Sequence, residues 1–277
     1  MIDPVAPVKS PRSNYARKLH EFEGIAFADQ AAFQHRGRWA DFFQKRIGNR
    51  FDGRIIFEAG CFDAAYLCRI ALKNPQTGFI GLDWKCRAIY EGAARITEMG
   101  LRNIALIHGR AQTVRSIFAD REVDEIWVFH PDPCDRPVEL KNRLIAEPFL
   151  VDAHPVLRDH SSTLSLKTDH PGYYQWVLGL FGVPMPEWFG SGGELRVGPA
   201  VLPRVRLRDL CSMAEIPDAS DAILERFKIT SNSTDYWNDA AVLAATSSRC
   251  FAGEATLFES RFIRKKLPIY FFQIGRK

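Results

Sequence analysis

Four short apolar runs in this chain each end on an acidic residue, and this pattern constrains the fold more than any other feature. The acids are Glu58, Asp83, Asp132 and Asp169, which follow RIIF, GFIGL, EIWVFHP and STLSLKT. Short apolar runs joined by helix-like stretches predict the parallel strands of an α/β sheet. Because ligands of such sheets bind outside the carboxyl ends of the strands, we expect the four carboxylates to share one crevice. That crevice disfavours an anion and favours a cationic or hydroxyl-rich ligand.

The rhythm of strand and helix predicts a doubly wound sheet that is mostly parallel. An initial helical stretch is expected at 27–46, and an antiparallel last strand at 269–274. Between them we predict strands at 54–59, 78–83, 104–108, 125–130 and 164–168, and helices at 65–73, 87–99, 114–118, 147–157 and 173–181.

The domain organisation follows from the length of 277 residues and the 46% hydrophobic content, which fit one large domain with additions. We interpret residues 1–50 as an N-terminal extension with a helix, and residues 51–277 as the main domain. An insertion rich in Gly and Pro is expected at about 182–221. Its Trp188, Phe189, Arg204, Arg206 and Arg208 can cover a small substrate or contact RNA, but we favour packing and solvation as their roles.

Composition argues against a membrane protein and against a metal centre. No apolar stretch approaches the roughly 18–20 residues that span a bilayer, and the segment MIDPVAPVKS lacks the apolar core of a signal peptide. We therefore expect a cytoplasmic protein. The six cysteines form no CxxC pair and the seven histidines form no HExxH motif, so no metal is expected.

The net charge of +4 is unevenly distributed. Residues 1–54 carry ten Lys and Arg against six Asp and Glu, and residues 261–277 carry six against none. Basic segments of this kind are suited to phosphate contacts in nucleic acids. The excess of acids in the middle of the chain weighs against that reading.

The turn after the first strand indicates which cofactor fits. A dinucleotide site needs several glycines there, but the turn Glu58–Ala64 contains only Gly60, and Phe62 and Asp63 would obstruct or repel a diphosphate. S-adenosyl-L-methionine carries a sulfonium, an ammonium and a ribose diol without phosphate. Glu58 suits the cationic end and Asp83 the ribose hydroxyls, and Trp84 can cover the adenine ring.

Seven ordered segments resemble the bacterial tRNA (guanine-N7)-methyltransferases, a family of Rossmann-like class I methyltransferases that use S-adenosyl-L-methionine. The segments are Arg36-Gly37-Arg38-Trp39, Glu58-x-Gly60, Phe79-Ile80-Gly81-Leu82-Asp83, Gly100-Leu101-Arg102-Asn103, Pro131-Asp132-Pro133, Thr168-Asp169 and Thr256-Leu257-Phe258-Glu259.

The resemblance implies roles for particular residues. It implies catalytic roles for Asp132 and Asp169, and a reaction at a ring nitrogen that needs no general base because a lone pair attacks the methyl group. It places the cofactor at Glu58, Gly60, Asp83, Trp84, Arg110 and Ala111, and the substrate at Asp132, Thr168, Asp169, Thr256 and Glu259.

The chain also departs from the family pattern. Phe62 and Ala64 replace the second and third glycines of the first turn, and side chains there narrow the approach to the cofactor. Cys134 replaces the tryptophan of the family's PDPW segment, and the acids Asp135 and Glu139 replace basic residues, which weakens phosphate attraction.

Three hypotheses remain open at this point. The chain methylates guanine N7 of tRNA, or it is a diverged member that methylates a small azaheterocyclic or purine-like metabolite, or it binds cofactor or RNA without turnover. The partner is accordingly tRNA or a small nitrogen heterocycle. Structural roles also suit several of these residues, since Pro-Asp-Pro can form a rigid turn and Thr-Asp can cap a helix.

Overall fold

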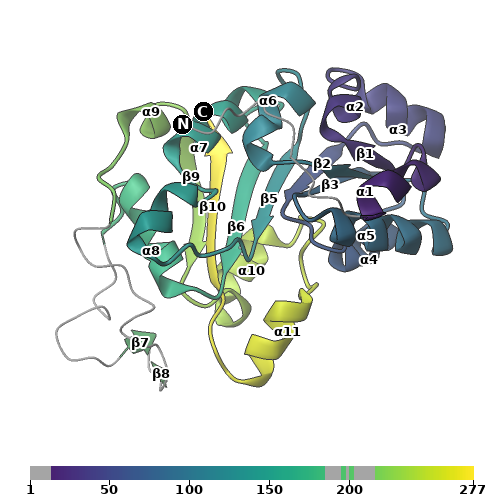
Figure 1. Ribbon diagram of the computed structural model, residues 1–277. Helices are drawn as coiled ribbons and strands as arrows, with labels where there is room; N and C mark the ends of the chain where they lie inside the picture. The colour runs from purple at the N-terminus through teal and green to yellow at the C-terminus, as the bar shows by residue number, and fades with distance from the viewer. Residues whose placement is uncertain (1–13, 185–194, 198–199, 203–215) are drawn as a thin grey trace. The chain divides into compact units, whose positions relative to one another are not determined.

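The computed structural model describes residues 14–184, 195–197, 200–202 and 216–277. Its elements are shown in Figure 1. The first half of the chain contains α1 (Asn14–Lys18), β1 (Ala26–Ala28), α2 (Asp29–Phe33), α3 (Trp39–Ile47), β2 (Ile55–Ala59), α4 (Ala65–Lys73), β3 (Gly78–Asp83), α5 (Cys86–Glu98), β4 (Ile104–His108), α6 (Val114–Ile117) and β5 (Glu125–Phe129). The second half contains α7 (Glu147–Val156), β6 (Thr163–Thr168), α8 (Pro171–Leu180), β7 (Leu195–Val197), β8 (Ala200–Leu202), α9 (Asp221–Leu224), β9 (Phe227–Ser233), α10 (Ala240–Thr246), α11 (Leu257–Arg264) and β10 (Tyr270–Arg276).

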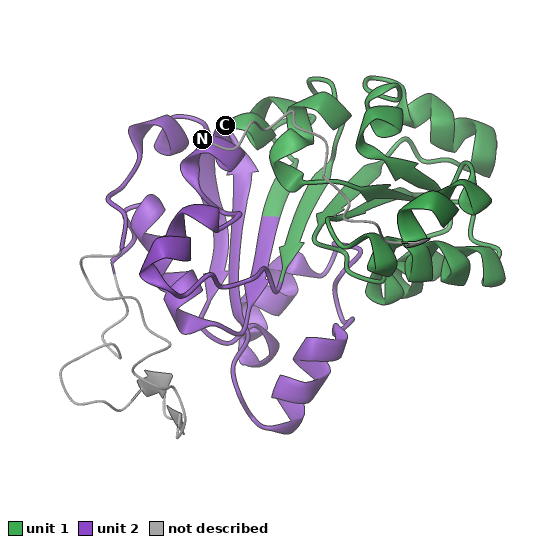
Figure 2. Cartoon of the chain, in the orientation of Figure 1, with its two compact units in different colours: residues 1–129, 152–164 green, residues 130–151, 165–277 purple. Residues whose placement is uncertain are grey.

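Eight of the strands in the described residues form one mixed sheet with the order β1-β4-β3-β2-β5-β6-β10-β9. The chain divides into two compact units, which Figure 2 colours separately. The first unit comprises residues 1–129 and 152–164, and the second comprises residues 130–151 and 165–277.

The first unit has the doubly wound architecture. Strands β2, β3, β4 and β5 are buried along their whole length, which explains why their sequences are continuous apolar runs rather than alternating ones. The pairs β1–β4, β4–β3, β3–β2 and β2–β5 are all parallel. Helices α4 and α5 lie on one face of these strands and α3 and α6 on the other (Figure 1), as right-handed crossovers in opposite directions require.

The predicted helix at 27–46 is wrong in its first part. Residues 26–28 instead form β1, whose backbone pairs with Leu106–His108 at the edge of the sheet. The remainder is divided into α2 and α3, because Glu122 accepts hydrogen bonds from the backbone nitrogens of Gly37 (2.8 Å) and Trp39 (2.9 Å). Gly37 has a φ of +75°, which a helix does not allow. These long-range partners are invisible to a local reading of the sequence.

The other predicted elements of the sheet are confirmed to within a few residues at their ends, with α4, β3 and β4 matching the expected bounds. In the second unit β10 pairs antiparallel with β9, from Phe271 opposite Ser233 to Arg276 opposite Phe227. The predicted fold class, mostly parallel with an antiparallel C-terminal strand, is confirmed.

Most of the predicted insertion lies outside the described residues, and so do Trp188, Phe189, Arg204, Arg206 and Arg208. The assignment of 1–50 and 51–277 as separate regions stays a prediction. Across the part of the chain that is described, no helix is both long enough and apolar enough to cross a membrane.

Candidate active site

The turn from β2 into α4 keeps a glycine-like backbone in spite of its sequence. Glu58 is buried at the end of β2, and Gly60 has a φ of +93° with open space where a Cβ would stand. Phe62 and Ala64 have φ values of 50° and 53°, in the left-handed region that disfavours side chains. The two residues that replace the family's glycines therefore adopt the backbone conformation that glycine would adopt, at a cost in strain.

Asp83 at the end of β3 is tied to that turn. One carboxylate oxygen accepts a hydrogen bond from the Phe62 backbone nitrogen at 3.0 Å, and the other from the Lys85 backbone nitrogen at 2.7 Å. The residue is only 7% exposed, and this burial raises the pKa of the Asp83 carboxyl even though the two hydrogen bonds act in the opposite direction. Each oxygen keeps a second lone pair, so the carboxylate can still accept a hydroxyl pair.

Two exposed aromatic rings accompany Asp83. Phe62 and Trp84 are 50% and 61% exposed, and the Lys85 ammonium lies 5.7 Å and 5.5 Å from their ring centroids. Arg110 is exposed and Ala111 is buried in the segment after β4, where the Thr113 hydroxyl donates to the Arg110 carbonyl at 2.7 Å. This part of the first unit offers an acid, a glycine with open space and flat apolar surface.

In the second unit, Asp132 lies exposed on a turn that a buried arginine supports. The Asp132 carboxylate accepts a long hydrogen bond from the Cys134 backbone nitrogen at 3.3 Å. Arg143 is almost fully buried and donates from Nε to the Pro133 carbonyl at 2.8 Å. Its guanidinium also lies 5.0 Å from the Trp176 ring centroid. Arg143 thus holds the Pro-Asp-Pro turn while leaving the Asp132 carboxylate accessible.

Asp169 follows β6 and is paired with His130, which follows β5. The His130 backbone nitrogen donates to the Lys167 carbonyl at 2.7 Å, and the side chains meet at 3.0 Å between His130 Nδ1 and Asp169 Oδ1. Burial alone would raise the pKa of Asp169, but the hydrogen bond and charge of His130 hold it below its ordinary value. Thr168 is buried, and its hydroxyl accepts from the His170 backbone nitrogen at 3.1 Å.

Glu259 has a different environment, because its carboxylate is enclosed by protein donors. Its Oε1 lies 3.0 Å from Lys167 Nζ and accepts from Trp237 Nε1 at 3.2 Å, while Oε2 accepts from the Thr256 backbone nitrogen at 2.6 Å. The Thr256 hydroxyl caps the Glu259 nitrogen in return, which completes a capping box at the start of α11.

The ion pair of Lys167 and Glu259 is completely buried, with both side chains 0% exposed. Burial raises the pKa of Glu259, but the charges of Lys167 and His130 and the hydrogen bonds from Thr256 and Lys167 together leave the value lowered. The Lys167 ammonium also lies 4.3 Å from the Tyr236 ring centroid. These contacts make Glu259 part of the packing of the second unit, and its contact with substrate stays a prediction.

The structure therefore divides the predicted residues between the units. Glu58, Gly60 and Asp83 adjoin one turn of the first unit, whereas Thr168 and Asp169 end β6 in the second. The gathering of all four acids in one crevice stays a prediction.

The sequence reasoning missed His130 and Lys167. A signal for His130 was its place directly before Pro-Asp-Pro, and a signal for Lys167 was a single cation inside an apolar strand. Within the described ranges, no group of three or more His, Cys, Asp or Glu side chains is placed to hold a metal ion.

Comparison with known proteins agrees with the motifs. Residues 52–183 match a family described as "Putative methyltransferase". A tRNA (guanine-N(7)-)-methyltransferase of Oenococcus oeni is 32% identical over 174 residues, covering 61% of this chain and 76% of the relative. This chain belongs to the tRNA (guanine-N(7)-)-methyltransferase family. A second member, from Christiangramia forsetii, is 35% identical over 148 residues, which is 53% of this chain.

The match to several relatives is partial. The chain spans 63% of the length of the Christiangramia forsetii and Porphyromonas gingivalis family members. Among solved structures, the 16S rRNA methyltransferase KamB has a TM-score of 0.50 at 13% identity, covering 84% of this chain and 91% of that chain. This likeness concerns the fold alone.

Proposed function

We propose that this chain transfers a methyl group from S-adenosyl-L-methionine to N7 of a guanine in tRNA. The observation that carries the proposal is the position of the family's acidic residues. Asp83 lies at the carboxyl end of β3, and Asp132 and Asp169 follow β5 and β6, where ligands of doubly wound sheets bind. Relatives that are 32–35% identical to this chain are named for that reaction.

The first unit provides groups that fit the cofactor. The Asp83 carboxylate has spare acceptor capacity for the ribose hydroxyls, the open space at Gly60 admits the methionine portion, and the exposed Trp84 ring offers a stacking surface for adenine. Glu58 adds a negative charge suited to the cationic end. S-adenosyl-L-methionine supplies a methyl group on a sulfonium, and the ring nitrogen that receives it becomes positively charged.

The second unit provides groups that suit such a product. Asp132 is exposed and Asp169 is partly exposed, with a pKa lowered by His130, so Asp169 is ionised at neutral pH. Negative charge near a ring that becomes cationic is more favourable after methyl transfer has begun than before it, which is the requirement for catalysis. No proton leaves N7, so neither acid needs to act as a base.

Exposed cations on and after α11 support a polynucleotide substrate. Arg261, Arg264, Lys265 and Lys266 all lie on the surface of the second unit. Phosphate contacts of this kind release counterions, so tRNA affinity should fall steeply as salt concentration rises. A small heterocyclic substrate would show little dependence on salt.

The test is incubation with a methyl-labelled cofactor and separate pools of tRNA and small metabolites, followed by mass analysis of the labelled product. We expect label in tRNA as 7-methylguanosine. Asp132→Ala should abolish transfer with the fold intact, and Asp83→Ala should weaken cofactor binding measured by calorimetry. Label in the small-metabolite pool alone, or full activity of both variants, contradicts the proposal.

A further inference from the structure

The imidazole of His130 is buried and held in one orientation. Its side chain is 6% exposed, and Nδ1 is hydrogen-bonded to Asp169, whose side chain is 34% exposed. The His130 backbone has a φ of 51°, in the left-handed region that is uncommon for residues other than glycine. Non-glycine residues held in such conformations concentrate at functional sites. The proposed reaction assigns this side chain an effect on Asp169 but no contact with the substrate.

The partner of Nδ1 determines what Nε2 can do. The His130 hydrogen bond keeps the pKa of Asp169 low although burial acts against it, so the carboxylate is ionised and can only accept. Nδ1 must therefore carry the hydrogen and donate it. In the neutral imidazole Nε2 then has a lone pair and is a hydrogen-bond acceptor.

Nε2 is buried and has no hydrogen-bond partner anywhere in the described part of the chain. Its ring neighbour is Phe258, whose centroid lies 5.9 Å away and which cannot donate to nitrogen. Buried polar atoms in native proteins nearly always have a partner, and one that lacks it needs an explanation such as a ligand. The missing partner here must be a donor, because Nε2 accepts.

We propose that His130 Nε2 accepts a hydrogen bond from the N1–H edge of the guanine that is methylated, with Asp169 as the residue that positions the imidazole. This inference rests on the proposed function and specifies which nucleobase edge the site recognises. As the guanine ring gains positive charge, its N–H becomes a stronger donor, so the bond strengthens toward the transition state. A base with an acceptor at that position, such as adenine at N1, leaves Nε2 without a donor and is disfavoured.

Two carboxylates of the second unit lie close to His130. Asp169 contacts it directly, and the Glu259 carboxylate on α11, itself paired with Lys167 on β6, interacts with it electrostatically. Negative charge around the imidazole also favours a guanine ring that becomes cationic.

Two isosteric substitutions separate this role from a structural one. In His130→Asn the side-chain amide occupies the position of Nδ1 and can still donate to Asp169, but nothing occupies the position of Nε2. In His130→Gln the amide oxygen can reach the position of Nε2 and does not titrate. We expect kcat/KM on tRNA to fall by about 100-fold in His130→Asn and by about tenfold in His130→Gln.

If His130 merely holds Asp169 in place, His130→Asn retains more activity than His130→Gln, and the inference is overturned.

A measurement without turnover tests the contact directly. In protein labelled with ¹⁵N at histidine, the Nε2 resonance of His130 should shift when guanosine is added. The matched ligand is 1-methylguanosine, which lacks the N1–H and should leave the resonance unchanged. Equal shifts with both nucleosides, or none with either, overturn the inference. Failure of the chain to methylate tRNA contradicts the proposed function, whereas this titration still decides the role of His130.

Discussion

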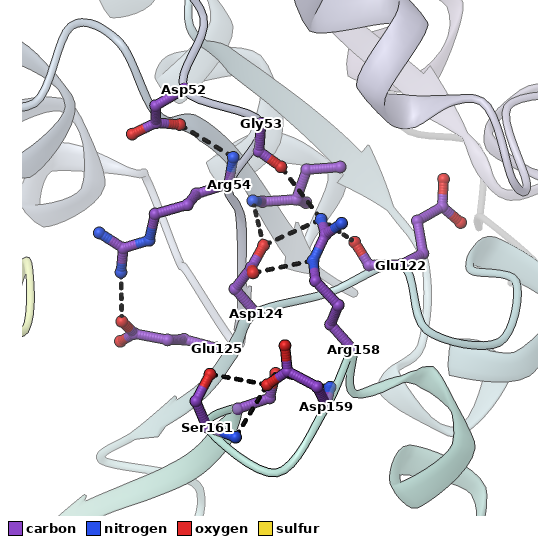
Figure 3. Close-up of polar contacts among 11 residues, drawn as sticks. Asp52, Gly53, Arg54, Glu122, Asp124, Glu125, Arg158, Asp159 and Ser161 are labelled. Atoms are coloured by element: carbon purple, nitrogen blue, oxygen red, sulfur yellow. Dashed lines mark hydrogen bonds and ion pairs between the residues drawn. The ribbon is translucent and has the colours of Figure 1, made fainter.

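Two charged regions of this protein differ in whether their hydrogen-bonding capacity is used up. The amino-edge network of the first unit consists of residues before and at the start of β2 and β5, together with the loop after α7 (Figure 3). Asp124 accepts from the Ile55 backbone nitrogen at 2.7 Å and from Arg158 Nε at 2.8 Å. Arg158 also donates to the carbonyl oxygens of Gly53 (3.0 Å) and Glu122 (3.3 Å).

The pair of His130 and Asp169 in the second unit is arranged differently. It contains one side-chain hydrogen bond of 3.0 Å, a left-handed backbone at His130 and a buried Nε2 without a partner among the described residues. In the first region both carboxylate oxygens of Asp124 accept hydrogen bonds, and such a group contributes to stability because its removal leaves its donors unsatisfied. In the second region, the unused acceptor His130 Nε2 is suited to a ligand that donates a hydrogen bond. The difference predicts that mutations in the first region change stability and mutations in the second change activity.

The largest effect should come from Glu259. This residue lies in the same unit as His130 and Asp169, but its carboxylate is enclosed by protein donors, so its substitution should change stability rather than activity alone. Glu259→Ala leaves the fully buried Lys167 ammonium without its carboxylate and removes the capping box of α11, so we expect a loss of about 3–5 kcal/mol in the free energy of unfolding. Urea denaturation measures it. The double variant Lys167→Met/Glu259→Gln should recover most of the loss, and an additive loss would contradict this account.

Asp169→Asn should affect activity more than stability. An asparagine amide can donate to Nδ1, which favours the tautomer with hydrogen on Nε2 and removes the acceptor. We expect a loss of about 100-fold in kcat/KM, equivalent to about 2.7 kcal/mol in the activation free energy. Steady-state rates over a series of tRNA concentrations measure kcat/KM. As a control, the unfolding midpoint of the variant should be close to that of the wild-type chain. Unchanged kinetics would remove Asp169 from the mechanism.

Asp124→Ala should show the opposite behaviour. It leaves the Ile55 nitrogen and part of the Arg158 guanidinium without their acceptor, and we expect a loss of about 2–3 kcal/mol in stability with kcat/KM unchanged at a temperature where the variant is folded. The matched control is Asp120→Ala, which breaks a surface pair with Arg115 and should cost less than about 1 kcal/mol. A loss of activity in folded Asp124→Ala would contradict the claim that the first region contributes to stability alone.

Strain in the turn after β2 predicts a smaller effect of opposite sign. Phe62→Gly and Phe62→Ala both remove the half-exposed ring, but only glycine relieves the left-handed backbone. The glycine variant should be more stable than the alanine variant by about 1 kcal/mol, measured by thermal unfolding. Equal stability of the two variants would show that the turn relaxes without strain.

The smallest expected effect is on acid stability. Burial acts to raise the pKa of Asp169, but the hydrogen bond and charge of His130, with smaller contributions from the backbone and His170, leave it lowered in the folded state. Its stabilising contribution is therefore present above the unfolded value of about 3.9 and is lost as pH falls through the folded value. Asp169→Asn should therefore show a shallower loss of stability on acidification. Parallel curves of unfolding free energy against pH for the two proteins would contradict the pairing with His130.

Local sequence patterns predicted most of the sheet for a clear reason. Strands such as Gly78–Asp83 and Ile104–His108 are buried on both faces, so each residue is apolar and the pattern is continuous. The sequence pattern wrongly predicts a helix at residues 27–28, because the strand that they form pairs with β4, about eighty residues later in the chain. The acids at the strand ends were located correctly, but their partners were not, since a hydrogen bond such as His130 to Asp169 joins residues 39 positions apart.

The amino-acid sequence by itself determined the order of strands and helices, the position of Asp83, Asp132 and Asp169 at strand ends, and the family, because these depend on burial periodicity and on short ordered motifs. The tertiary structure decided which acids are already engaged. Glu259 and Asp169 both sit in family motifs, yet one is enclosed by Lys167 and the other holds an imidazole with an unused acceptor. That distinction depends on which side chains meet after folding, and only packing in three dimensions determines it.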